Sequence, residues 1–296
     1  MTSKFIQFLQ FTFNGIASGS LIALIGVGFS VIYRATRIFH IAHGAIYTFT
    51  SFILYSLLIS LKIPVLVAVP LALLSGMVMG FLIERYIYNP LFRKDASGGI
   101  YLLSSIGVYI FLVNLIALIY GNEVKVLSPG IEPTVKLLGV VITRIQFLQI
   151  LIAVLLFVLL FMFLKRSFWG KLIRAYADDS VLLETRGINP FKIRTFVFII
   201  GSFFAGVSSI LTSLDVGIDP HVGMNVFLQG AVACIIGGVD RIEGAVLGGY
   251  LLGLLQSYVI WRTSSRWADA VTFALLILFL LLKPEGLLGI RRRIEE

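Results

Sequence analysis

Long, nearly uncharged runs of apolar residues follow one another along almost the whole of this 296-residue chain. Hydrophobic residues make up 58% of it, charged residues make up only 13%, and the mean hydropathy is +1.00. A globular core of this size could not hide so much apolar surface from water. A helix rises about 1.5 Å per residue, so roughly 20 residues cross the hydrocarbon of a bilayer. The sequence therefore predicts an integral membrane protein made of transmembrane helices.

The apolar runs predict nine candidate spans within a single transmembrane domain over residues 1–296. They lie at 5–33, 39–60, 64–83, 100–119, 146–164, 195–214, 225–239, 243–261 and 267–282. The run at 225–239 is short, and the run at 5–33 is long and rich in glycine, so either could be broken or re-entrant. We expect an all-α, polytopic helical membrane protein with about eight or nine transmembrane segments.

The distribution of Lys and Arg predicts the orientation, because cytoplasmic loops accumulate these residues. One set of alternate loops holds 17 of the 24 Lys and Arg residues. This set comprises the turn at 34–38, the loops at 84–99 and 165–194, the turn at 240–243 and the C-terminal tail. We therefore expect a cytoplasmic C-terminus, an external N-terminus and a cytoplasmic loop at 165–194.

Charge and motifs exclude several classes of function. The net charge of +9 comes from scattered loop residues without a patch that could follow a phosphate backbone, so no nucleic-acid partner is expected. Nearly all carboxylates lie in loops or at span ends, which disfavours an ion-coupled carrier. His40 and His43 lack a nearby carboxylate or cysteine to complete a metal site, and an interfacial role is expected for them instead. Motifs of hydrolases and of ATP binding are absent from the sequence. We expect a protein that is not an enzyme, binds no metal, and is driven by another chain or by a gradient.

The segment from Lys165 to Arg194 is the most charged of the predicted cytoplasmic loops. It has helical composition around Asp179 to Arg186, and Gly187-Ile188-Asn189-Pro190 is a typical helix end. A short polar helix that carries Val181, Leu182 and Leu183 suits docking into a groove on a soluble partner. The alternative is a solvated loop that serves only the orientation of the chain.

Glycines at spacings of four residues predict close packing between helices. The alternative for any one pair is a glycine that a membrane helix merely tolerates. The candidate packing residues are Gly15, Gly19, Gly237, Gly238, Gly244, Gly248, Gly249 and Gly253.

Three motifs, in the same order, resemble the permease subunits of branched-chain amino acid ABC importers (LivH type), over about Asn14 to Gly286. The first is GIASGSLIALIGVGFSVIY followed by RIFHIAHGA, which contains the Ala-His-Gly of that family. The second, GKLIRAYADDSVLLETRGIN, resembles its cytoplasmic loop, and the third is FIIGSFFAGVSSIL with the later IGG and GAVLGG elements. Two departures are Ala45-Ile46-Tyr47, where the family often has an acidic residue, and Glu184-Thr185, where it often has small apolar ones.

The resemblance implies a helical permease in the cytoplasmic (inner) membrane of a prokaryote. Its implied partners are a second permease subunit, identical or homologous, two cytoplasmic ATP-binding subunits and an external substrate-binding protein. The partner subunits use the ATP, and this chain binds no cofactor itself. The residues that the resemblance assigns to ATPase coupling are Gly170, Arg174, Ala175, Asp178, Asp179, Glu184, Gly187, Ile188 and Asn189.

The expected mechanism is alternating access, in which ATPase closure moves the coupling helix and the permease pair rocks. Branched-chain or other neutral amino acids are the expected substrates. Urea or short amides are the alternative substrates, and a gradient-driven carrier or channel is the alternative mechanism. Polar residues within the spans are candidates for lining the pathway, although helix–helix hydrogen bonding is an alternative role for each. They are Asn14, Ser18, Ser20, His43, Thr48, Asn114 and Gln229.

Overall fold

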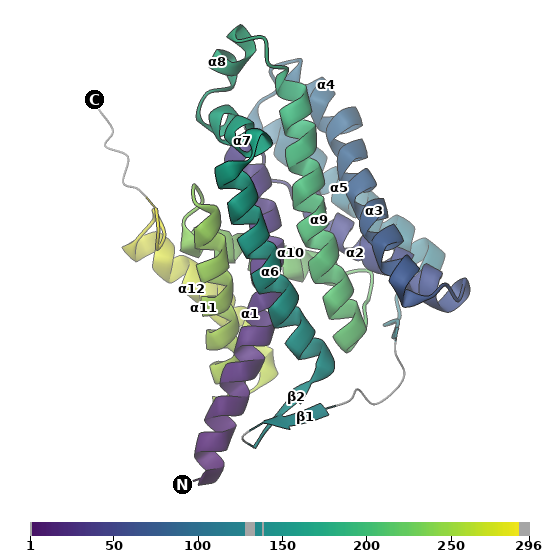
Figure 1. Ribbon diagram of the computed structural model, residues 1–296, viewed down its shortest axis with the longest axis vertical. Helices are drawn as coiled ribbons and strands as arrows, with labels where there is room; N and C mark the ends of the chain where they lie inside the picture. The colour runs from purple at the N-terminus through teal and green to yellow at the C-terminus, as the bar shows by residue number, and fades with distance from the viewer. Residues whose placement is uncertain (1, 128–133, 138, 290–296) are drawn as a thin grey trace. The chain divides into compact units, whose positions relative to one another are not determined.

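The computed structural model describes residues 2–127, 134–137 and 139–289, and within these ranges the chain is almost entirely helical (Figure 1). Eight helical segments of the described chain are long and apolar enough to cross a membrane, and α10 (Val222–Gly237) is a shorter apolar helix. This confirms the expected all-α, polytopic membrane fold. The short predicted span at 225–239 corresponds to α10. The long first run is not broken, because α1 (Thr2–Thr36) is one continuous helix.

The described residues divide into two compact units, which we treat separately. Unit 1 comprises residues 1–30, 131–153 and 228–296, and unit 2 comprises residues 31–130 and 154–227. Helices α1, α6 (Arg144–Arg166) and α10 contribute residues to both units. The remaining elements of unit 1 are β1 (Thr134–Leu137), β2 (Val140–Thr143), α11 (Ile242–Arg262), the 3₁₀ turn η3 (Ser265–Trp267) and α12 (Ala268–Leu282). Those of unit 2 are α2 (Ala42–Tyr55), the π-helical turn η1 (Ser56–Ser60), α3 (Val65–Ile83), the π-helical turn η2 (Glu84–Tyr88), α4 (Asn89–Phe92), α5 (Gly98–Tyr120), α7 (Phe168–Asp178), α8 (Ser180–Thr185) and α9 (Pro190–Val216).

Unit 1 is organised around the antiparallel pairing of α1 with α11. Near the start of α1, the ring of Phe8 stacks on Tyr258 with centroids 5.6 Å apart, and Phe11 stacks on Trp261 at 5.7 Å. The antiparallel hairpin β1–β2 is tied to the same end of α1, because Gln10 exchanges two hydrogen bonds of 2.8 Å with the backbone of Val141. The core of this unit consists of Ile22, Val232, Ala233, Ile236 and Leu252.

Unit 2 is organised around α2, α3 and α9, which pack against one another. Small residues recur every four positions on the buried face of α3, so the backbones of its neighbours can come close to it. They are Ala68, Ala72, Gly76 and Gly80. A Cβ on Gly76 would collide with the Thr50 hydroxyl of α2, and one on Gly80 with the Ser202 hydroxyl of α9.

The predicted loop at 84–99 begins with a helical extension of the third span. The structure continues the helix through η2 and α4 to Phe92, and this span covers Val65–Phe92. Glu84 can therefore lie in a buried helical turn, where an ion pair described below compensates its charge.

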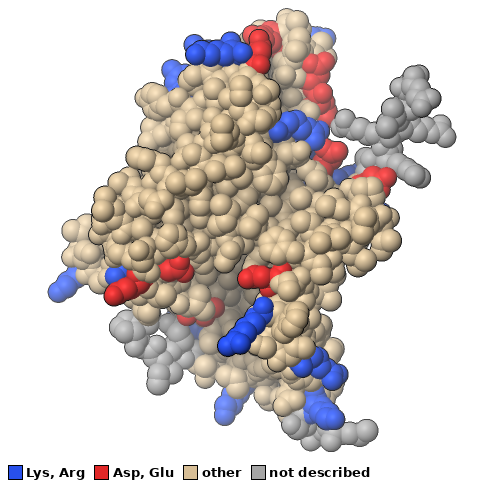
Figure 2. Space-filling view, turned by 180° about the vertical axis from the view of Figure 1, so that it is seen from behind, with Lys and Arg blue, Asp and Glu red and all other residues tan. Residues whose placement is uncertain are grey.

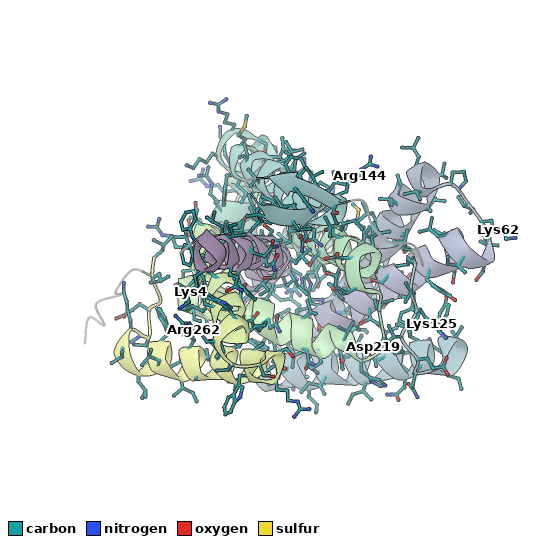
Figure 3. All side chains as sticks on the ribbon, turned by 90° about the horizontal axis from the view of Figure 1, so that it is seen from below. Lys4, Lys62, Lys125, Arg144, Asp219 and Arg262 are labelled. Atoms are coloured by element: carbon teal, nitrogen blue, oxygen red, sulfur yellow. The ribbon has the colours of Figure 1, made fainter. Side chains whose placement is uncertain are left out.

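Residues other than Lys, Arg, Asp and Glu cover most of the visible surface, and these four charged types occupy little of it (Figure 2). The charged residues labelled in Figure 3 lie at helix ends or in connecting loops. In unit 2, Lys62, Lys125 and Asp219 follow η1, α5 and α9. In unit 1, Lys4 and Arg144 lie near the starts of α1 and α6, and Arg262 ends α11.

Candidate functional site

The polar segment between the spans α6 and α9 forms two short helices, α7 and α8, which we call the α7–α8 segment (residues 168–185). Side chains cap the start of each helix. Ser167 Oγ accepts a hydrogen bond from Gly170 N at 2.8 Å, and Asp179 Oδ1 accepts from Val181 N and Leu182 N at 2.9 and 3.0 Å. Such caps satisfy amide groups that the helix itself leaves without partners. Helix α8 lies where the sequence predicted one, whereas α7 was not predicted as a separate helix.

The end of α8 follows the predicted glycine pattern. Gly187 adopts φ +76°, a left-handed conformation that glycine reaches without strain. Its N–H donates to Glu184 O at 2.9 Å, and the N–H of Ile188 donates to Leu183 O at 3.2 Å. These two bonds form a Schellman motif, which closes the helix. Asn189 Oδ1 then accepts from Phe191 N at 2.9 Å and caps the start of α9.

One face of the α7–α8 segment packs on the protein and the other is open. Ile173, Tyr176 and Leu183 are buried. Gly170 is also buried, and a Cβ there would collide with the backbone oxygens of Phe163 and Leu164 at the end of α6. The open face of α8 carries two apolar side chains, because Val181 is 69% exposed and Leu182 is 57% exposed.

Most of the residues predicted for ATPase coupling lie on this open face or in the turn after it. The exposed ones are Ala175, Asp178, Asp179, Glu184, Gly187 and Asn189. Arg174 and Ile188 are half-buried, and Gly170 is buried. The structure thus brings this set together in one short segment, and its functional role stays a prediction.

A buried ion pair, which the sequence analysis missed, lies beneath the α7–α8 segment in unit 2. Arg194 of α9 donates from Nε to Glu84 Oε1 at 2.8 Å and from Nη2 to Oε2 at 3.3 Å. The side chains are 2% and 0% exposed. The Arg194 guanidinium also lies over the ring of Phe92, 4.2 Å from its centroid. The sequence analysis had assigned both residues to loops. The signal it left unused was a pair of opposite charges at the predicted cytoplasmic ends of two spans.

Two buried tyrosines also approach the Arg194 guanidinium. Tyr176 of α7 is 5% exposed and Tyr101 of α5 is 8% exposed, and each phenol interacts with Arg194. Burial raises the pKa of Tyr176, and the positive charge of Arg194 opposes that rise. Tyr176 is therefore a neutral partner of the guanidinium at neutral pH.

Glu84 and Tyr88 are the first and last residues of η2, and Tyr88 makes a polar contact with a residue just before α2. The hydroxyl of Tyr88 makes a 2.9 Å hydrogen bond with Nδ1 of His40, which is fully buried. Burial, followed by the nearby His43, lowers the pKa of His40 well below its usual value of 6.5. His40 is therefore neutral at pH 7. Both histidines are buried inside unit 2 at the start of the span Ala42–Ser60, and the interfacial role expected from the sequence stays a prediction.

The pathway candidates of unit 2 lie in two different environments. His43 and Thr48 are buried on α2, where Thr48 donates to Gly44 O at 3.2 Å. Asn114 is exposed on α5 and donates to Ile110 O of its own helix at 2.8 Å.

The pathway candidates of unit 1 make hydrogen bonds within or between helices. Ser20 is buried and donates to Ile16 O at 2.9 Å and to the Tyr250 hydroxyl at 3.1 Å. Ser18 donates to Asn14 O at 3.0 Å, and Asn14 Oδ1 accepts from Gln10 at 3.2 Å. Gln229 donates to Asp269 at 3.3 Å. Contact between a substrate and any of these candidates, in either unit, stays a prediction.

The candidate packing glycines other than Gly238 lie where helices of unit 1 approach one another, and Gly238 lies in the turn after α10. A Cβ on Gly15 would lie 2.9 Å from the Cα of Leu254, and one on Gly253 would collide with the backbone of Gly19. The remaining members make similar approaches to backbone atoms: Gly249 to Ala23, Gly237 and Gly244 to each other, Gly248 to Ala233, and Gly238 to Gly289.

Comparison with known proteins shows that the chain is similar to transport proteins. Residues 11–280 match the family described as "Branched-chain amino acid transport system / permease component". The chain is 34% identical to the high-affinity branched-chain amino acid transport system permease protein BraD of Pseudomonas aeruginosa, with 98% of each chain covered. It is 31% identical to the corresponding protein LivH of Escherichia coli, with 100% of each covered. A solved structure, PsaBC from Streptococcus pneumoniae in complex with Fab, is similar with a TM-score of 0.56 and 11% identity, covering 96% of this chain and 97% of that one. This last likeness concerns the fold alone.

Proposed function

Because the chain belongs to the permease components of branched-chain amino acid transport systems, we propose that it is the membrane subunit of an ATP-driven importer of branched-chain or other neutral amino acids. It is a transport subunit and not an enzyme. In the proposed complex it pairs with a second permease subunit. Two cytoplasmic ATPase subunits supply the energy, and an external binding protein delivers the amino acid.

The α7–α8 segment is the observation that carries this proposal. Val181 and Leu182 are exposed on a six-residue helix whose two ends are held by a cap and a Schellman motif. A short helix with an unpaired apolar face suits a groove on a partner protein. It is also joined directly to spans at both ends, so a partner that moves it also moves α6 and α9.

The proposed cycle is alternating access. ATP binding closes the two ATPase subunits and displaces the α7–α8 segments, and the permease pair then opens its pathway to the opposite side of the membrane. The pathway does not need to bind the amino acid tightly, because the binding protein selects it. Affinity in this scheme lies outside the chain.

Proteoliposomes test the function directly. The chain is reconstituted alone, or with the subunits that co-purify with it and the external binding protein on the side opposite the ATPase. Uptake of radiolabelled leucine is then measured with and without ATP on the ATPase side. Only the complete complex with ATP is expected to accumulate leucine. Uptake by the chain alone without ATP contradicts the proposal and supports a gradient-driven carrier or channel. Uptake of urea or a short amide in place of leucine retains the mechanism and changes the substrate.

A pair of matched variants tests the docking role of the α7–α8 segment. Val181 on α8 and Val216 at the far end of α9 are each 69% exposed. Val181→Asp places a charge where the ATPase is proposed to dock, and it is expected to reduce co-purification of the ATPase by about tenfold, as loss of an interface anchor does. Val216→Asp makes the same change at the opposite end of α9 and is expected to leave co-purification unchanged. Equal co-purification with both variants contradicts this docking site.

A further inference from the structure

Four other elements of unit 2 meet at Arg194 of α9. Glu84 reaches it from η2, Phe92 from α4, Tyr101 from α5 and Tyr176 from α7. Tyr176 is the contact that belongs to the α7–α8 segment. The guanidinium is therefore the point where this segment touches the buried polar interior of the helix bundle in unit 2.

The shape of the guanidinium explains how one side chain can hold so many partners. Its planar group has five N–H donors and two open faces. One edge holds both oxygens of Glu84, and one face lies over Phe92 at 4.2 Å from the ring centroid. Because the carboxylate is held by two bonds, a displacement of Arg194 moves Glu84 with it.

The polar contacts continue from Glu84 toward α2. Glu84 and Tyr88 are the first and last residues of η2, and π-helical turns within helices are frequent at functional sites. Tyr88 bonds to His40 Nδ1 at 2.9 Å, and His40 lies two residues before α2. A series of buried residues thus runs from Tyr176 through Arg194 to Glu84, along η2 to Tyr88, and from Tyr88 to His40.

We propose that Arg194 is a positioning residue that transmits the movement of α7 through Glu84 and η2 to the start of α2. The proposal rests on the ATP-driven function proposed above and specifies the route by which the ATPase acts on the spans. In this role Tyr176 is the input from the α7–α8 segment. Tyr101 touches the same guanidinium from α5 and lies outside the route.

A purely structural role for the ion pair is the competing explanation. A buried ion pair often contributes little net stability compared with well-packed apolar residues, although loss of one partner is strongly destabilising. Spatial continuity alone also does not demonstrate coupling between two places in a protein. The experiment must therefore separate transmission from stability.

Tyr176→Phe and Tyr101→Phe make this separation, because each removes one phenolic hydroxyl from the same guanidinium. Uptake per ATP hydrolysed and the melting temperature are measured in the complete complex in proteoliposomes. Tyr176→Phe is expected to lower uptake per ATP by about 3- to 10-fold with little change in melting temperature. Tyr101→Phe is expected to leave uptake per ATP at the wild-type value. Equal losses in both variants, no loss in either, or a loss with Tyr101→Phe alone overturns the proposal.

The double variant Glu84→Gln/Arg194→Met tests the ion pair without leaving a charge buried alone. It is expected to assemble and to hydrolyse ATP, while uptake per ATP falls by about tenfold or more. Wild-type uptake per ATP in this variant overturns the proposal. If the double variant does not assemble, the two tyrosine variants still decide the question.

The outcome for the wild-type complex separates the two proposals. If the wild type shows no ATP-dependent uptake, the proposed function fails. If the wild type transports and Tyr176→Phe transports equally well per ATP, only the role of Arg194 fails.

Discussion

Arg194 and Glu84 are separated by 110 positions in the chain, yet each satisfies the charge of the other in a buried site. The sequence analysis placed both in cytoplasmic loops, because a charged residue at the end of an apolar run ordinarily marks the membrane surface. Nothing in the local sequence of either residue reveals the other. His40 is a similar case, since its burial depends on Tyr88 and Phe198 from two other elements.

The burial of His40 predicts a loss of stability in mild acid. Its pKa is lowered in the folded protein, so the unfolded chain binds a proton more readily. The contribution of neutral His40 to the free energy of unfolding is therefore fully present above about pH 6.5, the usual pKa of histidine. It is lost as the pH falls below that value. The fall in melting temperature between pH 7.5 and pH 5.5, measured in detergent, is expected to be smaller for His40→Asn than for the wild type. An equal fall for both proteins would show that His40 does not cause it.

At the scale of single elements, the sequence predicted part of the α7–α8 segment: α8 and its glycine end were expected, and α7 was not. Its caps and its C-terminal motif involve residues no more than five positions apart, such as Asp179 with Val181 and Leu183 with Ile188. The crossings of α1 and α11 are different. The spacing of Gly15 and Gly19 indicated a close helix contact, but only the structure shows that Gly253 and Leu254 are their partners.

Removal of the Asp179 cap is expected to loosen α8. Asp179→Ala leaves the amides of Val181 and Leu182 without their acceptor, which costs about 1 kcal/mol of helix stability. Hydrogen exchange of these amides is expected to speed up by roughly fivefold. Asp179→Asn retains a capping oxygen and serves as the control, with exchange close to the wild-type rate. Equal exchange in Asp179→Ala and Asp179→Asn contradicts a capping role.

Gly253→Val is expected to destabilise the crossing of α1 and α11. Its Cβ would collide with the backbone of Gly19, and such overpacking typically costs about 1–3 kcal/mol. Gly107→Val on α5 is the matched control, because a Cβ there meets no atom within 4 Å. The melting temperature in detergent is expected to fall for Gly253→Val and to change little for Gly107→Val. A larger loss for the control would refute the close crossing.

At the scale of the whole molecule, the described chain contains eight membrane-length helices and the shorter α10. Hydropathy located every one of these segments, because the energetic cost of placing polar groups in lipid depends on composition averaged over some 20 residues. The ninth predicted segment is α10, which has 16 residues and is shorter than the membrane-length helices. The orientation of the chain stays a prediction from the distribution of Lys and Arg.

Cysteine labelling tests that orientation. Cys234 is buried and is replaced by Ala to remove any background. Lys62 and Arg186 are both exposed and lie on opposite sides in the predicted topology. In intact cells a membrane-impermeant thiol reagent is expected to label Lys62→Cys, whereas Arg186→Cys is labelled only after permeabilisation. The reverse pattern inverts the topology and removes the α7–α8 segment from the reach of a cytoplasmic ATPase.

The sequence by itself determined that the chain is a bundle of membrane-spanning helices with a polar segment between two spans, which contains a short helix that ends just before Gly187. These features depend on average composition and on hydrogen bonds between near neighbours, which a single sequence displays. Only the tertiary structure decided that Glu84, Tyr88, His40, Tyr176 and Arg194 form one buried polar series. The cost of burying a charge or a polar group is offset only by partners that folding brings from distant parts of the chain, and a linear pattern does not contain that information.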